Sequence, residues 1–422
     1  MLIKNAWIVD PASGIDEPLD ILIKYGFITA VGKNLEAFGP VIDAKGLVCC
    51  PGLCDMHVHL RQPGFTHKET IETGCKAAAA GGFTAVACMP NTLPVVDTPE
   101  LVAFITAEAS RVGHCKVYPV AAATKGLLGA ELTNFIALKA AGAVGISDDG
   151  RPVESAAKMQ EVIKKATECG LLAISHCEDL KIIDGGIINK GKISEELGVK
   201  GMDRASEDTI TERECALAEA CGGRVHIAHV STRGSVDIIR KAKARGVKVT
   251  AETAPHYFML TDELLKRRDA NFRMNPPLRE QEDVEAVLAG VLDGTIDCII
   301  TDHAPHTQEE KKNFETAPNG VIGLETSLAA VLTVLYHKKK LPLARIVELM
   351  SQNPTKLLGI SGGSLSVGSV ADITLFDPNE SWIVHSESFK SKARNTAFEG
   401  MTLKGRVKYT VLDGKIVYKD ED

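Results

Sequence analysis

The chain has 422 residues, of which 45% are hydrophobic and 24% are charged, and its net charge is -7. This length allows two or three domains, or one large barrel with additions. The acidic balance argues against a nucleic-acid-binding surface. No apolar run reaches the roughly eighteen residues that a transmembrane helix needs, which argues against a membrane protein.

The N-terminus predicts a short strand and not a signal peptide, because no long apolar core follows a charged start. The chain contains eleven cysteines, without a Cys-x-x-Cys pair, and most of them lie in apolar runs. This pattern is typical of reduced, buried thiols, so we expect a cytoplasmic protein.

The first fifty residues predict short antiparallel strands interrupted by Gly and Pro, at 2–9, 20–31 and 41–44. From residue 47 onward, apolar runs alternate with helix-like stretches such as 100–111, 156–169 and 236–245. Strands separated by helices pair in parallel, and buried parallel strands are nearly continuous apolar runs. We therefore predict an α/β fold with a (β/α)8 TIM-like barrel over residues 51–362. Its strand candidates are 47–54, 83–89, 116–121, 143–147, 171–175, 225–230, 247–251 and 297–301.

After Gly362, strand-like segments return at 371–376, 407–412 and 415–419, and Asp413-Gly414 between the last two is a hairpin signal. Neither end of the chain is long enough for a large core of its own. We therefore predict that 1–50 and 363–422 pair into one small β domain. The alternative is two independent decorations of the barrel.

Metal-ligand chemistry follows the first barrel strand. His57 and His59 are two residues apart, so on a strand they project from the same face and can reach one metal ion. Imidazole suits zinc and similar metals. A lone His-x-His pair is weak evidence, and its weight comes from the strands that follow.

Several later strand candidates also end in imidazoles or carboxylates, where a barrel places its catalytic groups. Each residue alone has a structural explanation; Asp149, for example, could be a turn residue before Gly150. Together, four histidines and two aspartates could hold two metal ions with a shared carboxylate. The residues after the fourth, fifth, sixth and eighth strands are Asp148 and Asp149, His176, His229, and Asp302.

Seven short motifs carry these residues and their neighbours: His57-Val58-His59-Leu60-Arg61, Met89-Pro90-Asn91-Thr92, Ser147-Asp148-Asp149-Gly150, Ser175-His176-Cys177-Glu178-Asp179, His229-Val230-Ser231-Thr232, Asn275-Pro276-Pro277-Leu278-Arg279 and Thr301-Asp302-His303-Ala304-Pro305-His306. Over essentially its whole length the chain resembles the amidohydrolase superfamily and, within it, the bacterial dihydroorotases. Many relatives bridge two metals with a carboxylated lysine after the fourth strand. This chain has aspartates there, as one bacterial branch of dihydroorotases does.

The resemblance implies two zinc ions, with Asp149 bridging them. His57, His59 and Asp302 would hold one ion, and His176 and His229 the other. If the strand persists, Asp148 points away from Asp149, so only one of them bridges, and Asp149 is favoured. By the same alternation, His226 and His229 should face opposite sides of the sixth strand.

The resemblance also implies an activity, the interconversion of N-carbamoyl-L-aspartate and L-dihydroorotate in de novo pyrimidine (UMP) biosynthesis. A zinc-bound hydroxide would attack an amide carbonyl that the second metal polarises. Asp302 would act as general acid and base.

Arg61 could bind the carboxylate of the substrate through two parallel hydrogen bonds. The resemblance adds other contacts to the substrate: His59, Asn91, Asn275, His306, and the backbone of Asn319 and Gly320. Relatives usually carry Phe where Asn319 stands. The polar composition of segment 306–320 predicts either a solvated loop or a lid over the substrate.

Two alternatives remain. One is another cyclic amidohydrolase, such as a hydantoinase, dihydropyrimidinase or allantoinase, which usually keeps the bridging lysine. The other is a non-catalytic dihydroorotase-like scaffold for aspartate transcarbamoylase, which is disfavoured because all six ligand positions are filled. A homodimer and an association with aspartate transcarbamoylase are left open as partners, and neither nucleic acid nor membrane is expected.

Overall fold

The computed structural model describes residues 1–36 and 39–421, and it has a mixed α/β fold. Its centre is a parallel sheet of eight strands in the order β15-β14-β13-β10-β9-β8-β7-β6. The two edge strands nearly meet, because Val58 bridges His303 in parallel and the N–H of His59 donates to the carbonyl of His303 at 2.8 Å. The strands are β6 (Leu53–Val58), β7 (Phe83–Cys88), β8 (Lys116–Ala122), β9 (Gly145–Ser147), β10 (Leu172–Ser175), β13 (Val225–Ile227), β14 (Val249–Thr253) and β15 (Cys298–Ile299).

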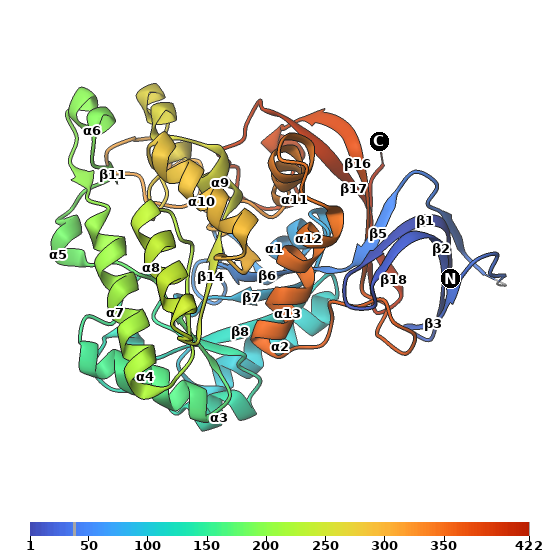
Figure 1. The fold of residues 1–422 in the computed structure, drawn as a ribbon, viewed down its shortest axis with the longest axis horizontal. Helices are drawn as coiled ribbons and strands as arrows, with labels where there is room; N and C mark the ends of the chain where they lie inside the picture. The colour runs from blue at the N-terminus through green and yellow to red at the C-terminus, as the bar shows by residue number, and fades with distance from the viewer. Residues whose placement is uncertain (37–38, 422) are drawn as a thin grey trace.

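Helices surround this nearly closed barrel (Figure 1). Side-chain caps fix where several of them begin: Thr70, Ser155 and Thr232 each accept a backbone N–H from the first turn of α1, α4 and α8. The main helices are α1 (Ile71–Ala80), α2 (Pro99–Val112), α3 (Phe135–Ala140), α4 (Ala156–Glu168), α7 (Ala205–Cys221), α8 (Arg233–Ala244), α10 (Gln281–Asp293), α11 (Ser327–Val331), α12 (Leu343–Val347) and α13 (Asn353–Leu358).

Smaller elements decorate the barrel. An excursion after β10 carries a two-stranded parallel sheet between short helices. Helices α11 and α12 continue as π-helical stretches at 332–338 and 348–352. The excursion comprises α5 (Leu180–Ile183), β11 (Ile188–Asn189), α6 (Lys192–Leu197) and β12 (Gly201–Met202), and α9 (Pro255–Met259) follows β14. Turns of 3-10 helix lie at 125–127, 262–267, 270–272 and 386–388.

A second sheet joins the two ends of the chain, and its N-terminal (blue) and C-terminal (red) strands lie side by side beside the barrel (Figure 1). Its strand order is β18-β17-β16-β5-β1-β2-β3, and β4 pairs with β1. The predicted domain boundaries stay a prediction. The strands are β1 (Leu2–Asp10), β2 (Ile15–Lys24), β3 (Phe27–Gly32), β4 (Val41–Asp43), β5 (Val48–Pro51), β16 (Ile373–Ile383), β17 (Thr402–Leu412) and β18 (Lys415–Lys419).

The structure corrects two predicted strands. The run 47–54 is two strands, because the chain passes from the second sheet into the barrel at Gly52. A Cβ at Gly52 would lie 2.1 Å from Thr84 Oγ1, so only glycine fits this crossing. The segment 20–31 belongs to two antiparallel strands that meet at a turn at Tyr25-Gly26. The hairpin predicted at Asp413-Gly414 is confirmed, and both residues have positive φ.

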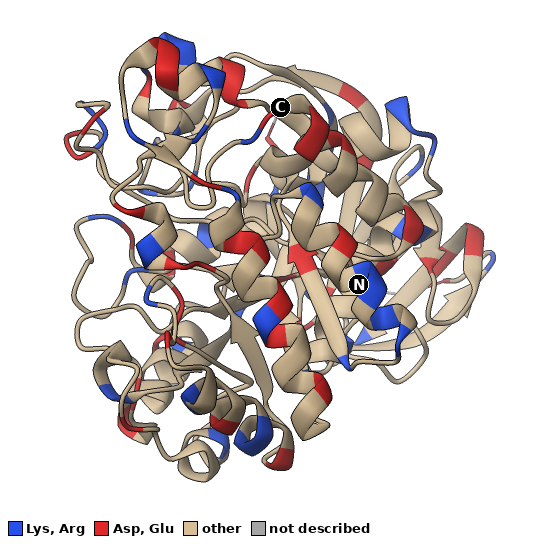
Figure 2. Ribbon diagram, turned by 60° about the vertical axis from the view of Figure 1, so that its left-hand side comes forward, with Lys and Arg blue, Asp and Glu red and all other residues tan. Residues whose placement is uncertain are grey.

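Positive and negative side chains are interspersed over the ribbon (Figure 2). Many form exposed ion pairs, such as Arg111 with Glu108 and Arg240 with Asp293. Each such pair contributes about 0–1 kcal/mol, so the fold depends mainly on its apolar core. Among the described residues, no helix has both the length and the apolar character needed to cross a bilayer.

Candidate metal centre and active site

The six predicted ligand side chains lie together at the C-terminal ends of the barrel strands. Each of them is at most 6% exposed to solvent. A barrel interior ordinarily excludes so many ionisable groups unless they are paired or bind a metal. They are His57 and His59 at the end of β6, Asp149 after β9, His176 after β10, His229 after β13 and Asp302 after β15.

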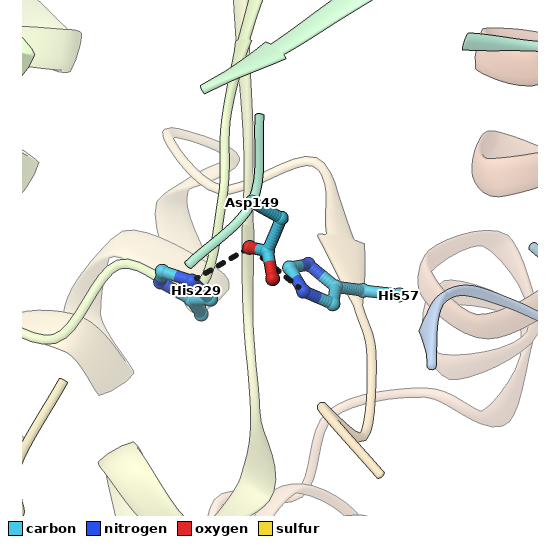
Figure 3. A group of neighbouring side chains, drawn as sticks. All are labelled: His57, Asp149 and His229. Atoms are coloured by element: carbon cyan, nitrogen blue, oxygen red, sulfur yellow. Dashed lines mark ion pairs between the residues drawn. The ribbon is translucent and has the colours of Figure 1, made fainter. Parts of the chain in front are cut away.

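Asp149 lies at the centre of this cluster, and Figure 3 shows its carboxylate between His57 and His229. Its Oδ1 is 3.4 Å from His57 Nε2, 3.5 Å from His176 Nδ1 and 3.8 Å from His229 Nε2. Its Oδ2 is 3.6 Å from His59 Nε2. The two oxygens of one carboxylate thus face four imidazoles from three strand ends.

The remaining contacts divide the cluster into two sides. Asp302 Oδ1 lies 3.2 Å from His59 Nε2 and 3.8 Å from His57 Nε2. On the other side, His176 Nδ1 and His229 Nε2 are 2.8 Å apart. Two groups have the spacing of a metal site: His57 with His59 and Asp302, and His57 with Asp149 and His229.

Asp148 points away from the cluster. Its carboxylate accepts hydrogen bonds from the backbone N–H and the hydroxyl of Thr124, the first at 3.0 Å. It therefore fixes the chain beyond β8, while Asp149 faces the histidines.

Three residues at this end of the barrel have left-handed backbone conformations. The φ angles are +62° at Arg61, +32° at His229 and +49° at Asp302. Such angles are uncommon for residues other than glycine and cost about 1–3 kcal/mol each. Each of these residues turns the chain just beyond a strand. Its side chain therefore takes a direction that the alternation of side chains along the strand does not predict.

Electrostatics in the cluster favours positive charge. Burial lowers the pKa of His57, but the carboxylates of Glu252 and Asp149 outweigh it and raise that pKa well above its ordinary value. At His176, burial is likewise outweighed by the adjacent carboxylates of Asp149 and Glu178, which raise its pKa to about 10. Burial raises the pKa of Asp149, yet the facing imidazoles hold it well below the ordinary range.

The donor set fits a bound cation. His57 Nε2 and Asp149 Oδ1 are buried and make no hydrogen bond within the described structure. Buried polar atoms normally have a partner, and a metal ion would satisfy both. Imidazole and carboxylate ligands without a thiolate suit a catalytic zinc site better than a closed structural one.

Sequence reasoning missed Glu252, on β14, and its neighbour His226. Glu252 Oε1 is 2.6 Å from His57 Nδ1, and its Oε2 is 3.1 Å from His226 Nε2. A carboxylate on Nδ1 leaves Nε2 of His57 available to a metal. That His226 and His229 face opposite sides stays a prediction: β13 ends at Ile227, His226 contacts Glu252, and His229 contacts Asp149.

Glu178 connects the cluster to a predicted substrate contact. Its Oε2 is 3.2 Å from His176 Nε2, and its Oε1 accepts a hydrogen bond from Asn275 Nδ2 at 2.8 Å.

His256, in α9, is buried, and its Nε2 makes no hydrogen bond in the described structure. Burial lowers the pKa of His256 to about 4, so it is neutral at neutral pH.

The predicted carboxylate-binding residues lie beside the cluster. Arg61 Nη2 is 3.3 Å from His306 Nε2, and Arg61 Nε donates to the carbonyl of Pro305 at 3.1 Å. Burial lowers the pKa of Arg61 to about 10, so the guanidinium stays charged at neutral pH. Asn91 Oδ1 is 2.9 Å from His59 Nδ1, which brings Asn91 to the same side.

Asn319 and Gly320 are held by the protein itself. Asn319 Oδ1 accepts from Arg273 Nη2 at 3.1 Å, and the Asn319 carbonyl is 3.0 Å from His306 Nε2. The Gly320 N–H donates to the carbonyl of Arg273 at 3.0 Å, and the Gly320 carbonyl accepts from Lys311 and Asn395. Both backbone polar groups of Gly320 are therefore engaged within the protein.

Known proteins resemble this chain over its whole length. The family described as Dihydro-orotase-like matches residues 46–235. A dihydroorotase from Geobacter sp. (strain M21) is 50% identical over 422 residues, covering 99% of both chains. A dihydroorotase from Thermoanaerobacter sp. (strain X514) is 48% identical over 423 residues, covering 100% of this chain and 98% of that protein.

Solved structures share the fold. The L-hydantoinase (dihydropyrimidinase) from Arthrobacter aurescens matches with a TM-score of 0.88 at 27% identity, covering 100% of this chain and 96% of its own. The D-hydantoinase (dihydropyrimidinase) from Thermus sp. matches with a TM-score of 0.82 at 27% identity and the same coverage. Sequence identity to the dihydroorotases is much higher, and the chain belongs to the dihydroorotase family.

Proposed function

We propose that this protein is an enzyme that interconverts N-carbamoyl-L-aspartate and L-dihydroorotate, the ring-closing step of pyrimidine biosynthesis. The observation that carries the proposal is the buried cluster of four imidazoles and two carboxylates around Asp149. Relatives named dihydroorotase at about half identity over the whole chain support it.

The cluster would hold two zinc ions. His57, His59 and Asp302 would bind one, His176 and His229 the other, and Asp149 both, as in the branch of dihydroorotases with an aspartate in place of the carboxylated lysine. When bound, the metals lower the pKa of a water molecule to roughly 7 and polarise the reacting carbonyl. The protein contributes the fixed, desolvated arrangement of ligands.

Asp302 is the proton carrier in this proposal. Burial raises its pKa, but the adjacent His59 and His57 outweigh burial and lower it to about 2, so its carboxylate is ionised and can accept a proton. In ring opening it takes a proton from the attacking water and returns it to the leaving ring nitrogen. In ring closing, it takes the proton from the attacking nitrogen and gives it to the departing oxygen.

Arg61 would orient the substrate through the carboxylate that does not react. His306 contacts Arg61, and Asn91 contacts His59, so a carboxylate bound by the guanidinium of Arg61 would also have His306 beside it. Asn275 would contact the ring, with His59 beside the reacting carbon. Asn319 and Gly320 would form the wall behind the ring.

The alternative substrates are the neutral cyclic amides, such as hydantoins, dihydropyrimidines and allantoin. The two hydantoinases share the fold at 27% identity. The half-buried guanidinium of Arg61, which makes no hydrogen bond to a carboxylate among the described residues, favours an acidic substrate, because a carboxylate could pair with its charge. A non-catalytic scaffold would not need six converging ligands.

The test compares turnover of L-dihydroorotate with turnover of hydantoin and allantoin by the zinc-loaded protein. We expect turnover of dihydroorotate alone, and the reverse preference would contradict the proposal. Asp302→Asn should keep the far-ultraviolet circular dichroism spectrum and lose at least about 10²-fold in kcat. Asp237→Asn on the exposed face of α8 is the matched control. Near-normal turnover by Asp302→Asn would rule out its role.

A further inference from the structure

The segment 306–320 runs along the site from His306 to Gly320, and a single buried ammonium fastens it. Lys311 is 7% exposed, whereas its neighbour Lys312 lies on the surface in an ion pair with Glu309. Lys311 Nζ donates to the carbonyls of Arg273, Pro318 and Gly320 at 3.1, 2.9 and 3.0 Å. An ammonium has three N–H donors, so these three carbonyls use all of them.

A second side chain fastens the same segment from a distant part of the sequence. Asn395 lies between β16 and β17 of the second sheet and is 3% exposed. Its Nδ2 donates to the carbonyls of Ala304 and Gly320 at 3.2 and 3.0 Å. Its Oδ1 accepts the backbone N–H of His306 at 3.1 Å. One amide therefore fixes both ends of the segment.

The two side chains converge on Gly320. Its carbonyl accepts from Lys311 and from Asn395, which accounts for both lone pairs of that oxygen. Gly320 has φ +139°, and a Cβ there would lie 2.9 Å from the Cβ and the carbonyl oxygen of Ala304. The backbone here is therefore closely packed as well as hydrogen-bonded.

Arg273 completes the attachment. It donates through Nη1 to the carbonyl of Phe314 and through Nη2 to Asn319 Oδ1, the latter at 3.1 Å. Phe314 and Ala317 are buried, so the segment also has apolar contacts. A segment with this many buried hydrogen bonds is costly to open, because each buried carbonyl left without a partner loses its hydrogen bond without gaining one to water.

We propose that Lys311 and Asn395 are positioning residues that hold the segment 306–320 as a preformed wall of the substrate pocket, so that it does not act as a lid. The proposal rests on the proposed function, because the wall carries His306, Asn319 and Gly320. In this proposal the connection between β16 and β17 of the second sheet also contributes to the pocket, because it carries Asn395. A preformed wall lowers the ordering cost of binding and should therefore affect substrate affinity more than the chemical step.

The test uses Lys311→Met, which keeps the length of the side chain and removes its donors, with Lys312→Met as the matched control. In the full-length, zinc-loaded protein, we expect Lys311→Met to raise KM for L-dihydroorotate by about tenfold or more, with a smaller change in kcat. Deuterium uptake by peptides covering 306–320 should speed up, with zinc content unchanged. Lys311→Arg, which keeps the charge and the donors, should restore part of both properties.

Asn395→Asp is the second variant, and it serves if Lys311→Met does not fold. The substitution keeps the oxygen that accepts the backbone N–H of His306. It replaces the amide N–H donor to the carbonyls of Ala304 and Gly320 by an oxygen that repels them. KM and deuterium uptake should therefore both increase, as in Lys311→Met. Asn379→Asp, on the exposed part of β16, is its control. Unchanged deuterium uptake, or a fall in kcat with an unchanged KM, would overturn the proposal. If the unaltered protein fails to turn over dihydroorotate, the proposed function fails, while deuterium uptake still tests the wall.

Discussion

The carboxylate of Asp149 faces four imidazoles at 3.4 to 3.8 Å, and three of these rings are oriented by partners outside the cluster. Glu252 holds Nδ1 of His57, Asn91 holds Nδ1 of His59, and Glu178 holds Nε2 of His176. Each partner leaves the other ring nitrogen directed at the cluster. A metal site of this kind depends on the outer partners nearly as much as on its ligands.

Glu252→Gln tests this dependence. The amide can still accept a hydrogen bond from His57, but the negative charge that raises the basicity of the ring is gone. We expect the dissociation constant of zinc, measured by competition with a chelator, to increase about 10- to 100-fold. Glu285→Gln on the exposed face of α10 is the control. Equal zinc affinity in Glu252→Gln and the unaltered protein would contradict the role given to Glu252.

The positions of the six candidate ligands could be predicted because each follows an apolar run, and parallel barrel strands end at one face. Glu252 and His226 were missed because they lie within β14 and β13, whereas the predicted ligands lie at or just beyond the strand ends. β13 stops at Ile227, and the positive φ of His229 turns its side chain back to the cluster. Strand alternation counted from the sequence fails at such a turn.

Among the elements, the order of the barrel strands could be predicted from the alternation of apolar runs and helices. The passage of the chain from the second sheet into the barrel at Gly52 could not. Residues 47–54 are continuously apolar because both sheets bury them. Nothing polar marks the crossing, and only the close approach of Thr84 requires glycine there. The segment between β16 and β17 was likewise not predicted to reach the site, because a loop carries no periodic pattern.

This segment also contacts the barrel through Glu325, just before α11. Its carboxylate accepts the backbone N–H groups of Lys390 and Ser391 at 2.9 and 3.0 Å. Burial raises the pKa of Glu325 from 4.5 to about 7, although these two hydrogen bonds oppose the rise. An acid with a raised pKa in the folded state stabilises that state fully below its unfolded pKa, and the contribution is lost as pH rises through the folded pKa.

We therefore expect Glu325 to make the free energy of unfolding fall between about pH 4.5 and 7, by on the order of 2–3 kcal/mol. Glu325→Gln should remove this part of the pH dependence. The measurement is urea unfolding of the zinc-loaded protein and variant across that range, with the difference between them plotted against pH. Parallel profiles would show that Glu325 titrates alike in the folded and unfolded states.

At the scale of the whole molecule, the two ends of the chain meet in one sheet, and that sheet contributes to the barrel's site. β5 leads directly into β6, which carries His57 to the cluster, while the connection from β16 to β17 brings Asn395 to Gly320. The second sheet is thus continuous with the strand that carries His57 and with the loop whose Asn395 contacts Gly320. Mutations in it should affect substrate binding as well as stability.

In the proposed enzyme, six side chains hold two metal ions around Asp149. The most direct measurement is an anomalous-difference map from crystals of the zinc-loaded protein, collected at the zinc absorption edge. We predict two peaks on either side of Asp149, one among His57, His59 and Asp302 and the other beside His176 and His229. A map with no peak at Asp149, or with zinc bound only elsewhere, would contradict the account.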